Sequence, residues 1–207
     1  MRVLITGFGP FPRAPFNPSA AVAKALARRR RPALAGLVRS VHIFATRYAD
    51  IDRDLPRLLA QRPDIVLMFG LAGRARELRV ETRARNAASA LLPDAGRRRP
   101  QHRTIETGAP PALIGRAPFS RLAAALRDRK VLARISRDAG TYLCNYAYWR
   151  ALEAAPHGRP LVLFVHIPLV HTAARPRQRV RRRQLSLPQI IGAAENLLIV
   201  LVAAARR

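Results

Sequence analysis

The chain has 207 residues, of which 49% are hydrophobic and one is cysteine, and it carries a formal net charge of +26. This apolar content can bury a continuous core and the single thiol excludes an intrachain disulfide, so we expect one cytoplasmic domain over residues 1–207. The charge does not exclude nucleic acid as a partner, because clustered cations bind phosphate.

The N-terminal segments predict a strand, a helix and a second strand. The run RVLITGF at 2–8 is apolar and reaches glycine early, which is typical of a buried strand that enters a loop. Its apolar part is too short for the core of a signal peptide. Asn17 as N-cap and Pro18 at the first helical position predict a helix over 17–29. A strand follows at 38–46.

The middle of the chain predicts a helix, a buried strand and a long excursion. Acidic residues open the helix expected at 49–61, where Pro56 predicts a kink. The run DIVLMFG at 64–70 is continuously apolar, as in a strand covered on both faces. Residues 93–118 contain five prolines and little periodicity, so we expect a surface excursion with one short strand. Excursions of this length are often functional.

The C-terminal part predicts alternating helices and strands, at 120–130, 131–136, 142–155, 160–168 and 185–207. The alternation along the whole chain predicts an α/β fold, a three-layer α/β/α sandwich with a mostly parallel central sheet and ligands at the carboxyl ends of its strands. The apolar stretch at 197–205 is far shorter than the roughly 20 residues that span a bilayer. We therefore expect a buried or interface helix there and no membrane partner.

The basic residues are almost all arginines. Lys24 and Lys130 are the only lysines, and arginine runs occur at 27–32, 96–100 and 177–184. This spread is typical of solvated surface arginine, and no aromatic-interleaved or known nucleic-acid motif accompanies it. Nucleic acid stays an alternative partner without support from a motif.

Cys144 lies at the predicted start of the helix at 142–155. Free backbone N–H groups and the positive end of the helix dipole favour a thiolate there and could hold an oxyanion. A lone cysteine is more commonly a small buried hydrophobe. This residue alone does not decide between a nucleophile and a core side chain.

Two further residues carry the same ambiguity. His166 ends the predicted strand at 160–168, where an α/β active site is built, but a satisfied structural histidine is the alternative. Glu81 lies among arginines that would keep it ionised. The alternative is that it belongs to a surface ion-pair network. Scattered histidines and one cysteine lack the spacing of a zinc site, so we expect no metal and no cofactor.

Six short segments, in this order, together resemble the pyrrolidone-carboxyl peptidases, also called pyroglutamyl peptidase I: TGFGPF, NPS, GLAG, VETRARN, AGTYLCNY and FVHIP. The likeness extends from Met1 to the last helix, and AGTYLCN is its most specific element. It implies that Cys144 is the nucleophile, His166 the general base and acid, and Glu81 the group that orients the imidazole.

The resemblance also implies a substrate and an assembly. The substrate is a small peptide with a blocked N-terminus, whose lactam ring lies against Phe8 and Phe11, with Leu71 and Asn17 as further substrate-binding residues. Phe8 and Phe11 could instead be core aromatics. The family is often homo-oligomeric and commonly tetrameric.

Several residues depart from the family pattern. Leu71 replaces a frequent glutamine, Arg74 replaces a glycine, and Leu91 replaces the arginine usually thought to assist the oxyanion. Loss of one such donor typically lowers the rate about a hundredfold to a thousandfold, unless a neighbour such as Arg83 or Arg85 replaces it.

Three hypotheses therefore remain. The first is a divergent pyroglutamyl peptidase. The second is a cysteine hydrolase of a different small N-blocked or lactam-like substrate. The third is a non-catalytic basic protein that binds nucleic acid or acidic partners through its arginines.

Overall fold

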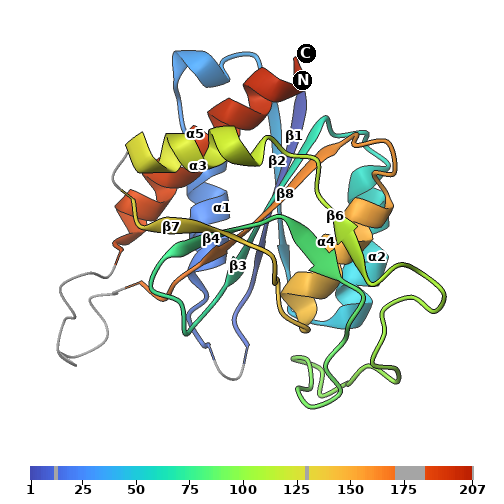
Figure 1. The fold of residues 1–207 in the computed structure, drawn as a ribbon. Helices are drawn as coiled ribbons and strands as arrows, with labels where there is room; N and C mark the ends of the chain where they lie inside the picture. Colours follow the sequence, from blue (N-terminus) through green and yellow to red (C-terminus); the bar gives the residue numbers. More distant parts are fainter. Residues whose placement is uncertain (12–13, 129–130, 171–184, 207) are drawn as a thin grey trace, which may run out of the picture.

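A central sheet of six strands organises the fold of the computed structural model, which describes residues 1–11, 14–128, 131–170 and 185–206 (Figure 1). The strand order is β2, β1, β3, β8, β4, β7, and neighbours are parallel except β4 and β8. The bounds are Arg2–Phe8 for β1, Val38–Phe44 for β2, Ile65–Leu71 for β3, Leu78–Glu81 for β4, Ala133–Ser136 for β7 and Leu161–Ile167 for β8. A separate antiparallel pair joins β5 (Arg83–Arg85) and β6 (Ala112–Ile114).

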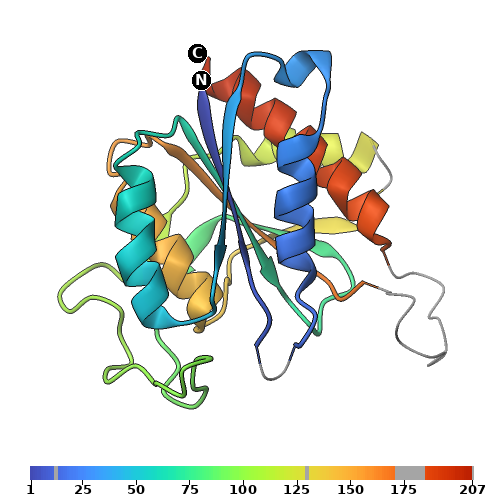
Figure 2. The same ribbon diagram turned by 180° about the vertical axis from the view of Figure 1, so that it is seen from behind.

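Helices cover both faces of the sheet (Figure 2). One face carries α1 (Pro18–Arg28), α3 (Phe119–Asp128) and α5 (Leu187–Ala205). The other carries α2 (Tyr48–Leu59) and α4 (Leu143–Glu153). A short 3-10 helix, Pro32–Leu34, follows α1. The predicted three-layer α/β/α sandwich with a mostly parallel sheet is confirmed.

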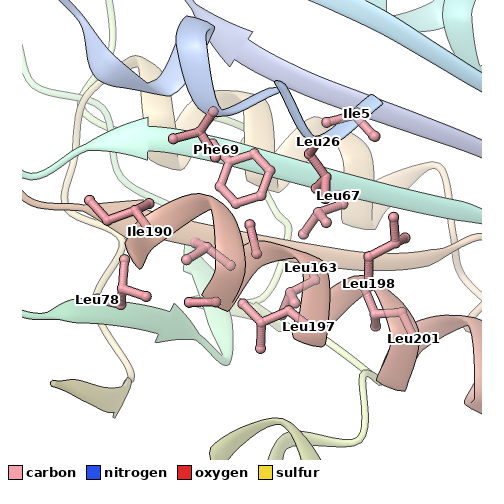
Figure 3. Packing of buried hydrophobic residues seen from close by; sticks show 14 of the residues in the cluster. Ile5, Leu26, Leu67, Phe69, Leu78, Leu163, Ile190, Leu197, Leu198 and Leu201 are labelled. Atoms are coloured by element: carbon pink, nitrogen blue, oxygen red, sulfur yellow. The ribbon is translucent and has the colours of Figure 1, made fainter. Parts of the chain in front are cut away.

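Strand alternation divides the core between the two faces. In β3, Leu67 and Phe69 pack with α1, α3 and α5, whereas Val66 and Met68 pack with α2 and α4. Figure 3 shows the first of these clusters, in which Leu197, Leu198 and Leu201 of α5 lie against the strands. Each face of the sheet therefore has its own apolar core.

The predicted strands and helices are confirmed, with ends that differ by about two residues at most. Asn17 caps α1 by accepting from the Ser19 N–H, and Pro18 follows it as predicted. The helix α2 continues through Pro56. The strand β6 lies inside the excursion predicted at 93–118, whereas the arginine run at 177–184 lies outside the described residues.

The sequence pattern did not predict β4 and β5. Their segment, LRVETRAR, alternates apolar and charged residues over strands of only four and three residues. So short an alternation is also typical of an exposed loop. The omission matters for the site, because Glu81 is the last residue of β4.

The helix α5 lies within the predicted helix at 185–207 and is two residues shorter at each end. Within the described ranges it is the one helix long and apolar enough to cross a membrane, and 44% of its most apolar window is buried. It packs on the sheet with Ile190, Ala194 and Leu198, so it has the environment of a core helix. Its capping box, formed by Ser186 and Gln189, fixes where it begins.

Candidate active site

Strand alternation directs His166 and Glu81 toward the face covered by α2 and α4. In β8, Val165 and Ile167 pack toward the opposite helices, so His166 between them faces α4. In β4, Val80 packs toward the same opposite face, so Glu81 also faces α4. Two side chains 85 positions apart in sequence thus meet above one face of the sheet.

Glu81 and His166 form a buried pair. The Nδ1 atom of His166 lies 2.9 Å from Glu81 Oε1, and the two residues are 7% and 0% exposed. The antiparallel register pairs Arg79 with His166, which places Glu81 diagonally across from the imidazole. The Tyr148 hydroxyl donates to the Glu81 carbonyl oxygen at 3.0 Å and so holds the end of β4.

Cys144 is the second residue of α4 and lies half-buried beside His166. Tyr142 at the N-cap contributes no side-chain capping bond. The first N–H groups of a helix have no carbonyl partner within that helix, so those of α4 are directed at the space beside the sulfur. A thiolate or a developing oxyanion would be stabilised at this position.

The imidazole of His166 interacts with both partners at once. Burial lowers the pKa of His166, but hydrogen bonds to the side chains of Cys144 and Glu81, together with their negative charges, outweigh burial and raise the pKa to about 9. The histidine therefore stays protonated through neutral pH when the thiolate and carboxylate are present. The imidazole thus links a thiol to a carboxylate, which are the groups that a nucleophile and its activating base require.

Gly70 provides the space for the sulfur, a role that the sequence analysis did not assign. It pairs with His166 in the β3–β8 register. A Cβ atom at this position would lie 2.7 Å from Cys144 Sγ and 2.7 Å from a ring carbon of Phe164. A signal was present in the sequence, because a glycine ending a buried strand often marks a close approach.

Asn145 ties the start of α4 to the excursion between β5 and β6. Its Oδ1 accepts from the Arg85 N–H at 2.8 Å, and its amide donates to the carbonyls of Arg85 and Ala87 at 2.8 and 3.1 Å. Two more bonds hold the excursion beside the loop before Cys144: the Ser89 N–H donates to the Thr141 carbonyl at 2.6 Å, and the Tyr142 hydroxyl donates to the Pro93 carbonyl at 2.8 Å. The excursion is thereby anchored next to the thiol.

The arginines expected to surround Glu81 interact elsewhere. Arg79 pairs with Glu77 at 3.2 Å, and the charged partner of Glu81 is His166 rather than a neighbouring arginine. Arg83 donates to the Arg137 carbonyl at 2.7 Å and Arg85 pairs with Asp138 at 3.3 Å.

Leu91, which stands where the family pattern has an arginine, points outward. Leu91 is 84% exposed. Because the Arg83 and Arg85 side chains bond elsewhere, neither replaces the missing donor in this conformation.

The four residues predicted to bind substrate occupy different environments. Phe8 is 2% exposed, and its ring centroid lies 5.7 Å from that of Phe44. It belongs to the core under α2 and α4, the face that carries Cys144, called the thiol face below. Phe11 is half-buried and forms a backbone bridge with Ala14.

The other two are less favourably placed for contact with a ligand. Leu71 pairs with Ile167, so strand alternation directs its side chain away from the thiol face. Asn17 is buried, and its amide bonds the Gly9 carbonyl and the Ser19 N–H. Its polar atoms hold the segment at 9–11 against the start of α1.

Comparisons with known proteins agree with this geometry. Residues 1–206 match the family model described as pyroglutamyl peptidase. A pyrrolidone-carboxylate peptidase of Thermococcus onnurineus is 33% identical over 84% of this chain and 86% of its own length. One from Ralstonia nicotianae, named pyrrolidone-carboxylate peptidase 1, is 34% identical over 83% of this chain and 80% of its own length.

Solved structures are similar over almost the whole chain. The pyrrolidone carboxyl peptidase from Thermococcus litoralis superposes with a TM-score of 0.86 at 30% identity and covers 99% of this chain and 94% of its own. That of Fervidobacterium islandicum gives a TM-score of 0.85 at 26% identity, with coverages of 96% and 97%. The similarity therefore includes every element that carries the site.

Proposed function

The chain belongs to the pyroglutamyl peptidase family of cysteine peptidases, and from this premise we propose that Cys144, His166 and Glu81 remove an N-terminal pyroglutamate from peptides. One observation carries the assignment of these residues. The imidazole of His166 bonds both Cys144 and Glu81, on the face of the sheet where α4 begins.

The proposed reaction needs only water and a reduced thiol. His166 holds the thiol proton while the Cys144 sulfur attacks the carbonyl carbon, so a C–S bond forms and the carbonyl π electrons move to oxygen. As the C–N bond breaks, the imidazolium gives its proton to the departing amine. Water then loses a proton to His166, attacks the thioester and releases pyroglutamate, which restores the thiol.

Glu81 fixes the tautomer of His166 in this proposal. A carboxylate oxygen 2.9 Å from Nδ1 accepts the Nδ1–H bond, which leaves Nε2 for the sulfur. The carboxylate also stabilises the imidazolium that donates to the leaving amine. A His166 pKa of about 9 keeps this proton in place at neutral pH.

For the acyl group, we assign the lactam ring to the segment at 9–11 and its neighbours. Phe11 is half-buried and available for ring contact, and Phe8 supports it from the core. Asn17 acts indirectly, because its amide holds the Gly9 carbonyl at 3.1 Å. Leu71 is the least favoured of the four predicted contacts, since its side chain lies on the opposite face.

The rest of the proposal concerns the setting of the enzyme. We place it in the cytoplasm as one domain over 1–207 and as a homo-oligomer. The lone thiol supports a reducing compartment. Partly buried apolar residues of α5, such as Ile191 and Ile199, support a further apolar contact.

The test is release of a fluorescent amine from a pyroglutamyl amide. Reduced wild-type protein is expected to cleave it, and Cys144→Ala is expected to lose all measurable turnover while retaining the wild-type melting temperature. The matching prolyl amide, which lacks the lactam carbonyl, should be a poor substrate. Folded, reduced wild-type protein that cleaves other blocked amides but not this one would identify a cysteine hydrolase of different specificity.

A further inference from the structure

Tyrosines cluster around the nucleophile, and one of them differs from the others. The ring of Tyr48, at the start of α2, lies edge-on to Tyr142 and Tyr146, with centroids 6.3 and 5.1 Å away. Both partners flank Cys144 in sequence, and all four side chains pack at the edge of the core beneath α2 and α4.

The hydroxyl groups of these tyrosines are not equally satisfied. Tyr142 donates to the Pro93 carbonyl at 2.8 Å, Tyr146 to Asp52 Oδ1 at 2.6 Å and Tyr148 to the Glu81 carbonyl at 3.0 Å. The hydroxyl oxygen of Tyr48 is buried, yet within the described part of the chain it has no hydrogen-bond partner. Buried polar atoms are nearly always bonded, so this exception requires an explanation.

The backbone holds Tyr48 in this position from a distant segment. Its N–H donates to Asp94 Oδ2 at 3.1 Å, while Asp94 Oδ1 accepts from the N–H groups of Gly96 and Arg98 at 2.8 and 2.9 Å. The same excursion is bonded to Tyr142, two residues before the nucleophile. The backbone of Tyr48 is therefore tied to the segment that also bonds Tyr142, by contacts that leave the Tyr48 hydroxyl unused.

The electrostatic surroundings keep this hydroxyl protonated. Burial raises the pKa of Tyr48, and the neighbouring acidic groups Tyr142, Asp94, Tyr146 and Cys144 raise it further when they are ionised. A tyrosine in this state can only be neutral at physiological pH, so it has a proton to donate.

The reaction proposed above needs such a donor. When sulfur adds to the carbonyl carbon, negative charge develops on the carbonyl oxygen, which is bonded to the same carbon as the sulfur. The arginine expected to assist there is replaced by Leu91, which is 84% exposed, and the side chains of Arg83 and Arg85 bond elsewhere. Neither Arg83 nor Arg85 therefore adds a side-chain donor to the α4 N–H groups.

We infer that the Tyr48 hydroxyl donates a hydrogen bond to the carbonyl oxygen that Cys144 attacks, together with the first N–H groups of α4. This inference rests on the proposed peptidase function. It explains why the Tyr48 hydroxyl is unpaired, because the substrate carbonyl supplies the missing acceptor. It also explains how Leu91 can stand in place of an arginine, because the neutral hydroxyl replaces the charged donor.

The test compares Tyr48→Phe with Tyr146→Phe, two changes that each remove one oxygen from the same aromatic cluster. For Tyr48→Phe we expect kcat on the pyroglutamyl amide to fall roughly tenfold to a hundredfold with KM within about twofold. Its melting temperature should be equal to or above that of the wild type, because the oxygen removed had no partner. Tyr146→Phe should keep kcat within about twofold and melt at a lower temperature, because it loses its bond to Asp52.

A pair of inhibitors separates the attacked oxygen from the lactam. The aldehyde of pyroglutamate adds to Cys144 and places an oxygen where the oxyanion forms, whereas 2-pyrrolidone offers only the ring. Tyr48→Phe should weaken the aldehyde at least about tenfold and leave 2-pyrrolidone within about twofold.

Three results would overturn the inference. Turnover of Tyr48→Phe within twofold of the wild type, or a change confined to KM, would exclude the bond to the attacked oxygen while leaving the peptidase function intact. Wild-type protein without any cleavage would overturn the function and the inference together.

Discussion

The two faces of the central sheet contain different kinds of residue. The face under α1, α3 and α5 is packed from aliphatic side chains and Phe69. The face under α2 and α4 holds Cys144, His166 and Glu81 together with the tyrosine cluster. Both faces bury an apolar core, but Cys144, His166 and Glu81 lie on the second.

The distribution of unpaired polar atoms follows the same division. Across the described residues, buried side-chain atoms without a hydrogen-bond partner include Thr6 Oγ1, Tyr48 Oη, Glu81 Oε2 and Trp149 Nε1, and all four belong to the α2/α4 face. An unpaired buried polar group typically destabilises a fold by about 1–3 kcal/mol. Within the described part of the chain, these unpaired groups therefore lie on the face that also carries Cys144, His166 and Glu81.

The largest effect expected from an amino-acid change on the α2/α4 face, apart from loss of the thiol, is that of Glu81→Gln. We expect kcat/KM to fall by about a thousandfold, because the imidazole loses the carboxylate that fixes its tautomer. The pH–rate profile gives a second readout. In the wild type, activity should fall as the pH rises through about 9, where His166 loses the proton needed by the leaving amine.

Removal of the carboxylate charge destabilises the imidazolium, so the alkaline limb of Glu81→Gln should move to lower pH. Glu77→Gln is the matched control, since Glu77 binds Arg79 and Arg134 away from the thiol. An unshifted alkaline limb in Glu81→Gln would contradict the role assigned to this residue.

A smaller effect is expected from Gly70→Ala. The new methyl group would lie 2.7 Å from Cys144 Sγ and 2.7 Å from a ring carbon of Phe164, so the sulfur and the ring must shift. We expect kcat/KM to fall roughly tenfold to a hundredfold and alkylation of Cys144 by iodoacetamide to slow.

Gly73→Ala provides the comparison for this change, because among the described residues its Cβ would meet only Leu169 Cδ1, at 4.0 Å. Equal turnover in the two alanine variants, with both folded, would remove Gly70 from the site.

The smallest effect on turnover is expected on the opposite face. Leu198→Ala removes a fully buried side chain from the cluster in Figure 3 and should lower the free energy of unfolding by about 2–5 kcal/mol. The fraction that stays folded should keep the wild-type kcat/KM. Leu132→Ala, at a residue 49% exposed, should change neither quantity appreciably. A loss of kcat in folded Leu198→Ala would break the division between the faces.

The fold could be predicted from the sequence because most of its elements have strong local signals. Asn17 and Pro18 mark the start of α1, and the run at 64–70 is apolar throughout, as a strand covered on both faces requires. The strand β4 escaped prediction because four residues with two charges carry too little periodicity.

The site could be predicted only in part. The motif around Cys144 and the position of His166 at a strand end were informative, whereas the partner of Glu81 depends on an antiparallel register that local pattern does not contain. The same limit applies to Gly70 and Tyr48. The close approach of Cys144 Sγ to Gly70 and the unpaired Tyr48 hydroxyl both depend on segments that are distant in the sequence.

Asp94 has a consequence for how the excursion and α2 depend on each other. The N-cap of α2, Arg47, supplies no side-chain bond, and the Asp94 carboxylate accepts from the Tyr48 N–H in its place. The cap of α2 therefore comes from a residue 46 positions after Tyr48. Without the Asp94 carboxylate the first turn of α2 would lose this cap, so the placement of Tyr48 depends on a segment that also bonds Tyr142 beside Cys144.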